Sequence, residues 1–311
     1  MNYYILFILG LGIGSFINVV TLRYREEGFV FGKHIVYGRS HCSSCKRVLS
    51  WYELVPLLSF IILLGKCRTC KSKLSFQYPI VELICGAFIS TIPYYFFKYH
   101  NDYFINTSSE WLILFSVLWI LVFLGLIIIG VIDYRKYIVP DELVLSTALL
   151  GIIWIIFLAV TNNFGFLKGS FLGEYASIFG LRAGSVTSDL AGYNLVFGLI
   201  VNHLVGFVLG LVLVGIIFFS TKGAAIGFGD VKLFGALGIL FGYPDVILIF
   251  FLSFISGAIF SLPLLVRKLK GMKDYVPFAP FIIFASTLVF YFGNDIIRIY
   301  FHFFDNLLIR F

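Results

Sequence analysis

The chain has 311 residues, of which 60% are hydrophobic, 19% aromatic and only 13% charged, and its mean hydropathy is +1.00. Soluble globular domains carry about 25% charged residues, so this composition excludes an ordinary soluble protein. The formal net charge is +7. The positions of the basic residues decide whether that charge indicates nucleic-acid binding or membrane topology.

Apolar runs of near twenty residues recur along the chain, as in WLILFSVLWILVFLGLIIIGVI (111–132), long enough to cross a hydrocarbon core of about 30 Å. We therefore predict an all-α polytopic membrane protein with about eight transmembrane helices. No basic region precedes the first apolar run and no A-x-A site follows it, so we expect a retained span, not a signal peptide. The expected spans, of which the sixth is short, are 3–20, 79–97, 111–132, 138–160, 193–219, 231–243, 245–266 and 276–297.

The basic residues fall in alternate connections between these spans. Ten Lys and Arg residues and three acidic residues lie between Thr21 and Tyr78, and eight more basic residues lie in connections on the same side of the membrane. By the positive-inside rule this side faces the cytoplasm. The net charge is therefore mainly a topology signal. We expect contact with membrane lipid and no nucleic-acid partner, because the basic residues are dispersed among membrane segments.

We divide the chain into a first transmembrane helix (1–20), a cytoplasmic loop (21–78), a second transmembrane helix with an outer loop (79–110), and a transmembrane bundle (111–311). Within the cytoplasmic loop, LVPLLSFIILLG (54–65) is apolar but too short to span, so we expect an interfacial or re-entrant segment. The connection 161–192 has no motif that indicates a function. No internal repeat is evident.

Four cysteines of the loop form two C-x2-C pairs separated by 21 residues: Cys42, Cys45, Cys67 and Cys70. This spacing is typical of tetrahedral zinc–thiolate binding. Two disulfides would need an oxidising compartment, and the expected cytoplasmic location favours zinc instead. Four protein ligands leave no open position for water, which indicates a structural site. His41 is an alternative ligand, whereas Cys85 lies in a predicted span and is expected to be a buried apolar residue.

Two aspartates lie at predicted membrane boundaries, where a charge is costly. Asp133 ends one helix in IDYRKYIVPDEL, and Asp230 begins another in GFGDVK, so the order of spans places both near the cytoplasmic side. Ionisable residues at membrane depth usually face a bundle interior or a water-filled cavity and mark function. Two adjacent carboxylates can share one proton, so that one activates water while the other protonates a leaving amine.

Gly227 and Gly229, just before Asp230, would weaken a helix, but they would let the backbone approach an extended substrate strand closely. The alternative interpretation is structural. Asp230 would then be a helix N-cap, and Asp133 would pair with Arg135 or Lys136 at a solvated helix end.

Several stretches in chain order resemble the type IV prepilin peptidases, which are bifunctional leader peptidases and N-methyltransferases of the GxGD membrane aspartyl proteases. GSFINVVTLR (14–23) resembles the end of the first span in that family. RSHCSSCKRVLSWYELVPLLSF, followed by GKCRTCKSKLSFQYPIVEL, resembles its cysteine loop, and IDYRKYIVPDEL and GFGDVKLFGALG resemble its two aspartate motifs. The resemblance covers residues 10–245. The chain departs from the family in its long 161–192 connection and in HCSSC, where a proline often follows the first cysteine.

The resemblance implies that Asp133 and Asp230 are the catalytic pair of an aspartic endopeptidase, with Asp141, Gly227 and Gly229 in supporting positions. Such an enzyme removes the basic leader of type IV prepilins or type II secretion pseudopilins at the cytoplasmic face of the bacterial inner membrane. It then N-methylates the new N-terminal residue, usually Phe, with S-adenosylmethionine as methyl donor.

The residues indicate less about the methyl-donor site, because no GxGxxG loop follows a strand. Glu53 and Glu82 are candidates, since methyl transfer needs a carboxylate or carbonyl near a neutral amine. Each would equally fit an interfacial carboxylate paired with a neighbouring lysine. Two other functions compete with the protease. A transporter would use the aspartates for proton or cation coupling, and a zinc-binding membrane scaffold would not need them.

Overall fold

The computed structural model describes residues 2–25, 28–32, 35, 38–100, 107–161, 188–267 and 276–308. Most of the 161–192 connection lies outside these residues. The described part contains no β-strand, only isolated bridges at His41–Val48 and Lys66–Lys73, so the predicted all-α class is confirmed. In chain order its helices are α1 (Tyr3–Arg23), the 3-10 helix η1 (Trp51–Leu54), α3 (Leu58–Ile62), α4 (Gln77–Lys98), α6 (Ser109–Lys136), α7 (Asp141–Val160), α10 (Ser188–Ser220), α11 (Phe228–Phe241), α12 (Tyr243–Val266) and α13 (Ala279–Leu308).

Six of these helices are long and apolar enough to cross a membrane: α1, α4, α6, α7, α10 over Val196–Ser220 and α12 over Tyr243–Pro263. By contrast, α11 has 14 residues, which is about 21 Å at 1.5 Å per residue. The apolar part of α13 is limited to Ala279–Gly293. The chain is therefore a multi-pass membrane protein, but the predicted count of about eight spans is not confirmed.

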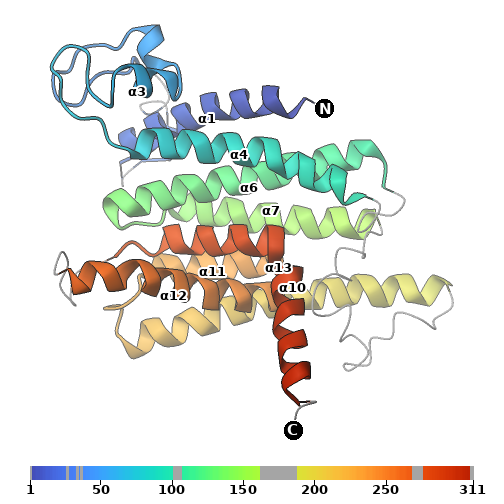
Figure 1. The fold of residues 1–311 in the computed structure, drawn as a ribbon. Helices are drawn as coiled ribbons and strands as arrows, with labels where there is room; N and C mark the ends of the chain where they lie inside the picture. Colours follow the sequence, from blue (N-terminus) through green and yellow to red (C-terminus); the bar gives the residue numbers. More distant parts are fainter. Residues whose placement is uncertain are drawn as a thin grey trace.

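The long helices lie side by side, with α1 and α4 along one side of the bundle and α10 to α13 along the other (Figure 1). Between them, α6 packs against α4 and α13, and α7 packs against α11. The loop with η1 and α3 projects at one end of the bundle beside α1 (Figure 1). This arrangement places the cysteine loop next to the ends of the central helices.

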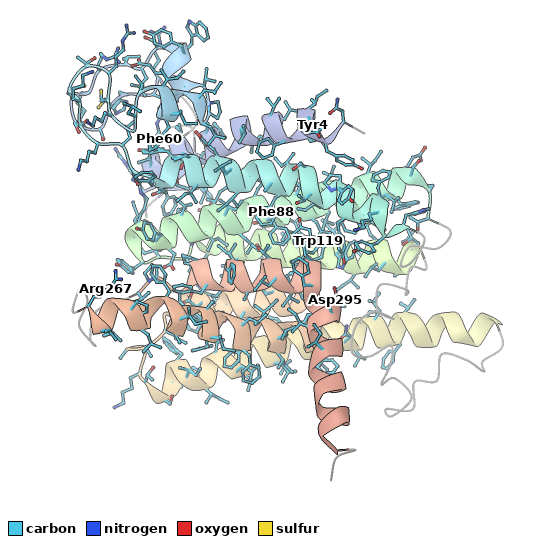
Figure 2. All side chains as sticks on the ribbon, in the orientation of Figure 1. Tyr4, Phe60, Phe88, Trp119, Arg267 and Asp295 are labelled. Carbon is cyan, nitrogen blue, oxygen red and sulfur yellow. The ribbon has the colours of Figure 1, made fainter. Side chains whose placement is uncertain are left out.

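An aromatic cluster fills the centre of the bundle. Trp119 of α6 and Trp154 of α7 are fully buried, with ring centroids 5.6 Å apart, and Phe290 of α13 lies 4.5 Å from Trp119. Phe88 of α4 stacks on Phe123 of α6 at 4.4 Å. Figure 2 shows Phe88 and Trp119 in the middle of the bundle. Each such pair adds about 0.5–1.5 kcal/mol beyond the burial of its area. The cluster therefore joins α4, α6, α7 and α13 into one unit.

The turn between α6 and α7 has a clear local origin. α6 ends at Tyr137, whose backbone is left-handed with φ 58° and whose N–H bonds back to the carbonyl of Asp133 at 2.8 Å. Pro140 then precedes α7, with Asp141 and Glu142 in the first helical turn. Acidic side chains stabilise a helix N-terminus by opposing its macrodipole. The turn is thus specified by the sequence IVPDE itself.

α10 and α11 pack backbone against backbone. A Cβ at Gly206 of α10 would lie 2.5 Å from the carbonyl oxygen of Gly238 in α11, and a Cβ at Gly210 would lie 2.3 Å from that of Phe234. Small residues allow membrane helices to approach this closely. As a consequence, α10 fixes the position of α11, the helix that carries Asp230.

This packing predicts opposite effects of the same change at two glycines of α10. Gly206→Ala should destabilise the protein by about 1–3 kcal/mol, because its Cβ meets backbone atoms that have to move. Gly198→Ala is the matched control, since a Cβ there meets nothing within 4 Å, and alanine favours a helix by about 0.5–1 kcal/mol. Thermal unfolding in detergent measures both. Equal melting temperatures for the two variants would contradict this account of the contact.

Candidate functional site

The two C-x2-C pairs form two knuckles with the same hydrogen bonds. In the first knuckle, the N–H of Cys42 donates to the carbonyl of Arg47 at 2.9 Å, and the N–H of Lys46 donates to that of Cys42 at 3.0 Å. The second knuckle repeats both bonds, at the same distances, with Cys67, Ser72 and Lys71 in the corresponding positions. The two predicted C-x2-C pairs therefore share one local backbone conformation.

The four cysteine sulfur atoms lie within 4.8 Å of one another, and all four cysteines are free. Backbone N–H groups of Cys45 and Ser44 lower the pKa of the Cys42 thiol to about 6, so it is largely a thiolate at neutral pH. The thiolate is the form that binds metal. The predicted four-cysteine cluster between the first two spans is confirmed, and its geometry suits one metal ion.

Two other predictions about this region have clear outcomes. His41 is exposed, its ring lies 3.3 Å from the carbonyl of Arg39, and it is not part of the sulfur cluster. The alternative of a histidine ligand is therefore not supported. Cys85 is fully buried in α4, against Gly14 of α1, as expected for a small apolar residue.

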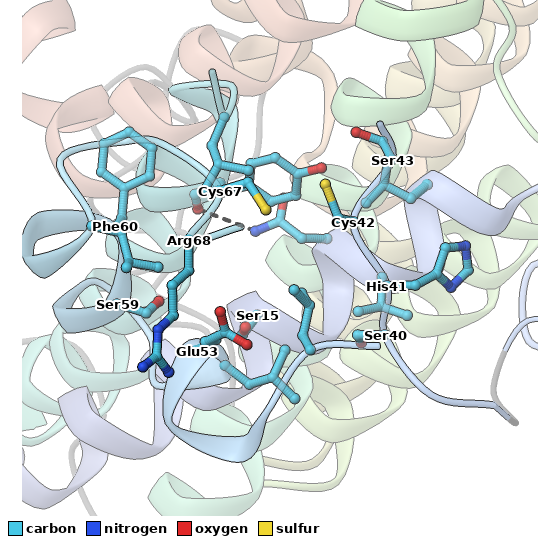
Figure 3. A pocket seen from close by; sticks show the side chains of 18 of the residues that line it. Ser15, Ser40, His41, Cys42, Ser43, Glu53, Ser59, Phe60, Cys67 and Arg68 are labelled. Carbon is cyan, nitrogen blue, oxygen red and sulfur yellow. Dashed lines mark hydrogen bonds between the residues drawn. The ribbon is translucent and has the colours of Figure 1, made fainter. Parts of the chain in front are cut away.

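A cavity of about 330 Å3 separates the cysteine knuckles from α1 and α4. Its wall includes Ser15 and Asn18 of α1, Glu53 and Arg68 of the loop, and Glu82 of α4. Figure 3 shows Glu53, Ser15 and Arg68 around this space, with Cys42 and Cys67 nearby. The side-chain oxygen of Asn18 is buried and has no hydrogen-bond partner. The cavity thus offers an unused acceptor and two carboxylates.

The two candidate glutamates are both buried. Glu53 accepts the N–H of Ser50 at 2.8 Å and pairs with Arg47 at 2.5 Å. These two interactions, that of Ser50 first, hold the pKa of Glu53 below its ordinary value, so Glu53 is a paired carboxylate, with arginine in place of the expected lysine. Glu82 accepts the N–H of Leu57 at 2.9 Å. Both carboxylates therefore support the loop as well as line the cavity.

Asp133 and Asp230 are brought together from distant parts of the chain. Asp133 lies in the last turn of α6 and Asp230 in the first turn of α11, with exposed fractions of 6% and 7%. Asp133 and Asp230 are close enough for their carboxyl groups to interact electrostatically. Neither aspartate takes part in an ion pair among the described residues, so the predicted pairing of Asp133 with Arg135 or Lys136 is absent there.

The surroundings of the two carboxylates differ. Oδ2 of Asp133 accepts the backbone N–H of Ala279, the first residue of α13, at 2.9 Å. Oδ1 of Asp230 is buried and has no partner among the described residues. The N-cap of α11 is Gly227, without a side-chain cap, so Asp230 is not the helix cap that the structural alternative requires. One carboxylate is anchored, and the other has an oxygen free to accept a proton or a hydrogen bond.

The two glycines before Asp230 have different surroundings. A Cβ at Gly229 would lie 2.8 Å from the Cβ of Val139, so Gly229 is needed for packing against the α6–α7 connection. A Cβ at Gly227 would meet only Oδ2 of Asp230, at 3.7 Å. Of the two glycines, only Gly227 is therefore still a candidate for close approach to a substrate backbone.

Asp141, at the start of α7, contacts the helix that carries Asp230. Its side chain is exposed and forms an ion pair with Lys232 of α11. Exposed ion pairs typically contribute about 0–1 kcal/mol. Asp141 thus links the start of α7 to the helix that carries Asp230.

The cysteine loop and the aspartates lie at the same end of the bundle. Lys136, near Asp133 in α6, donates to the carbonyl of Tyr24 just after α1, at 2.7 Å. Glu142 of α7 accepts the N–H of Val30, in the first part of the loop, at 3.0 Å. These contacts join the loop to the two helix ends that flank the aspartate site.

One participant in the site was not predicted from the sequence. The N–H of Ala279 holds Asp133, and the nearby ring of Phe278 stacks on Phe234 of α11 at 6.5 Å. A backbone N–H can come from almost any residue type, so the sequence does not mark which one donates. The only available signal was VPFAP (276–280), which interrupts the apolar pattern just before the last helix.

These features define a polytopic α-helical membrane protein with a four-cysteine loop and two buried aspartates at one end of its bundle. The model of the Bacterial Peptidase A24 N-terminal domain matches residues 8–96, and that of the Type IV leader peptidase family matches residues 175–262. The first range contains the four cysteines and the second contains Asp230, whereas Asp133 lies between them.

Similarity to curated proteins extends over nearly the whole chain. A prepilin leader peptidase/N-methyltransferase of Vibrio cholerae is 30% identical over 294 residues, which cover 93% of this chain and 96% of the relative. One of Bacillus subtilis (strain 168) is 28% identical over 299 residues, which cover 95% and 96%. No solved structure is significantly similar to the chain. The chain belongs to the type IV leader peptidase family, as the sequence resemblance predicted.

Proposed function

We propose that this protein is an aspartic endopeptidase that removes the basic leader of type IV prepilins or pseudopilins at the cytoplasmic face of the bacterial inner membrane. It then N-methylates the new N-terminal residue, usually Phe, with S-adenosylmethionine. The observation that carries the proposal is the pair of buried aspartates, Asp133 and Asp230, at one end of the bundle of a leader peptidase family member. The named relatives process prepilins.

The cleavage chemistry follows from two adjacent carboxylates. The proposed mechanism has them share one proton, so that one is ionised while the other is protonated. The ionised member takes a proton from water as the water attacks the scissile carbonyl, and the protonated member donates to the leaving amine. The backbone bond from Ala279 keeps Asp133 in place. The unpartnered oxygen of Asp230 leaves a position for a proton or a hydrogen-bond donor.

The cytoplasmic orientation rests on charge. The loop from Thr21 to Tyr78 holds ten basic and three acidic residues, and such loops remain in the cytoplasm. The contacts of Tyr24 and Val30 with α6 and α7 put the aspartates on that same side. A cytoplasmic loop keeps its thiols reduced, so the cysteine cluster is proposed to hold a structural zinc ion.

A division of labour is proposed along the chain. The bundle 111–311 carries proteolysis, and the loop 21–78 with the adjoining helices 1–20 and 79–110 carries methyl transfer. The cavity beside the cysteine knuckles is the proposed site of S-adenosylmethionine, which supplies an activated methyl group on a sulfonium. Glu82 on its wall is the carboxylate not already paired with an arginine, and the unpartnered oxygen of Asn18 can accept a hydrogen bond from an amine or hydroxyl.

Glu82→Gln tests this cavity by binding. Glutamine keeps an acceptor for the N–H of Leu57 but removes the charge, and a charged hydrogen-bond partner contributes about 1.5–3 kcal/mol. The affinity for S-adenosylmethionine, measured by equilibrium dialysis in detergent, should fall about tenfold or more. Glu110→Gln, on an exposed residue at the start of α6, is the matched control. Equal affinities in the two variants would exclude Glu82 from the donor site.

The direct test of the proposed function is processing of a prepilin-like substrate by detergent-solubilised protein. We expect the leader to be removed after its terminal glycine, and the mass of the new N-terminus to rise by one methyl group when S-adenosylmethionine is added. An intact substrate after prolonged incubation with folded protein would refute the peptidase. Cleavage without methyl incorporation would refute the second activity alone.

A further inference from the structure

A set of exposed apolar side chains surrounds α3 in the cysteine loop. We call this set the α3 surface; its members are Trp51, Leu58, Ile61, Ile62, Leu64 and Phe76, with exposed fractions of 57–82%. A water-facing loop does not usually gather large apolar side chains in this way. The α3 surface therefore requires a partner.

Two contacts fix the depth of the α3 surface relative to the membrane. The ring of Phe60 in α3, labelled in Figure 2, lies 5.4 Å from that of Phe76. Phe76 comes just before the first residue of the spanning helix α4. The N–H of Leu57 reaches the carboxylate of Glu82 at 2.9 Å. Glu82 lies about 8 Å along α4 from Gln77, at 1.5 Å per residue. The α3 surface is thus level with the first turns of a membrane span.

The α3 surface lies beside a helix that exposes apolar side chains of its own. α1, beside which α3 lies (Figure 1), exposes Ile5, Ile8, Leu9 and Phe16. Among the described residues, α4 is the main neighbour of α1. Lipid that covers α1 and the start of α4 would also meet α3.

The charges around the α3 surface are almost all positive. Residues 40–77 contain one acidic residue, Glu53, which is already paired with Arg47. The remaining basic residues of this stretch are all exposed: Lys46, Lys66, Arg68, Lys71 and Lys73. Basic residues next to a bilayer attract anionic headgroups, each by about 1 kcal/mol.

We propose that the α3 surface inserts into the boundary between headgroups and acyl chains, and that the basic residues of the knuckles bind anionic lipid headgroups. The loop is then a membrane-surface module whose partner is an anionic phospholipid leaflet. This proposal is independent of the peptidase and methyltransferase activities. It explains why an apolar segment too short to span the membrane lies beside a basic metal-binding fold.

Quenching of tryptophan fluorescence in reconstituted full-length protein tests the proposal. A Trp51→Phe background removes the exposed native probe, and Ile62→Trp places a new probe on the α3 surface. In bilayers that contain phosphatidylglycerol, brominated lipid should quench the added emission about twofold or more, and aqueous iodide should quench it little. Ser44→Trp, between Cys42 and Cys45 in the same background, is the matched control and should show the reverse pattern.

The other outcomes overturn the proposal. If iodide quenches the probe at position 62 and brominated lipid does not, the α3 surface faces water. Shielding from both quenchers would show that protein, such as a substrate helix or a second copy, covers it.

The role of anionic lipid has a separate test. Bilayers of phosphatidylcholine alone should reduce lipid quenching by about half, and so should the double variant Lys71→Glu with Lys73→Glu. Unchanged quenching in both would overturn the role of anionic lipid.

Discussion

In the Asp230→Asn protein, leader cleavage is expected to fall about a thousandfold or more, and Asp133→Asn should have a similar effect. General acid–base catalysis contributes about 10²–10⁴ in rate, and an amide can neither accept the proton from water nor donate one to the amine. Single-turnover cleavage of a prepilin-like peptide in detergent measures the loss. Asparagine has nearly the shape of aspartate, so thermal unfolding should confirm that both variants stay folded.

Asp141→Asn is the matched control for this experiment. It removes the same charge close to the site, but from an exposed side chain paired with Lys232. We expect cleavage within about tenfold of the unmodified protein, since an exposed pair contributes about 0–1 kcal/mol. Full activity of both the Asp133 and Asp230 variants would eliminate the aspartate mechanism, whereas loss only in Asp141→Asn would move the first catalytic position to Asp141.

Replacement of Cys42 and Cys67 by serine should release the metal and disable methyl transfer while leaving most leader cleavage. These are the two buried members of the cluster, one from each knuckle, so their loss leaves two ligands on opposite knuckles. The purified protein should contain about one zinc ion per chain and the double variant almost none. Methyl incorporation should fall tenfold or more, because the cavity wall includes both cysteines and a structural zinc site stabilises the fold around it.

Cys85→Ser controls for the loss of a thiol in general. Cys85 is buried within α4, away from the sulfur cluster, and its replacement should leave the zinc content unchanged. A metal-free preparation of the unmodified protein with all four loop thiols titratable would refute the zinc site. Unaltered methyl incorporation in the double variant would show that methyl transfer does not depend on the zinc site.

Much of this architecture could be predicted because its causes are local. A long apolar run predicts a helix, because a membrane span has to form the hydrogen bonds of its own backbone internally. The C-x2-C spacing predicts a knuckle from a few adjacent residues. The break between α11 and α12 was expected between the spans 231–243 and 245–266. It lies at Gly242, whose φ of 88° ends α11 after 14 residues.

The parts that could not be predicted depend on tertiary contacts. The bond from Ala279 to Asp133 joins residues 146 positions apart, and any residue except proline can supply the donor. The packing of Gly229 on Val139 likewise needs the relative positions of α11 and the α6–α7 turn. Sequence reasoning assigned that glycine to substrate approach because its packing partner lies ninety residues away.

The cavity beside the knuckles has a practical consequence for work on fragments. Its wall is shared between the loop and two spanning helices, which supply Ser15, Asn18 and Glu82. An excised soluble piece limited to residues 21–78 would still contain the four cysteines of the cluster, yet it would lack one side of the cavity and the anchor for Leu57. Such a fragment is expected to bind the metal ion but to show no binding of S-adenosylmethionine at the cavity.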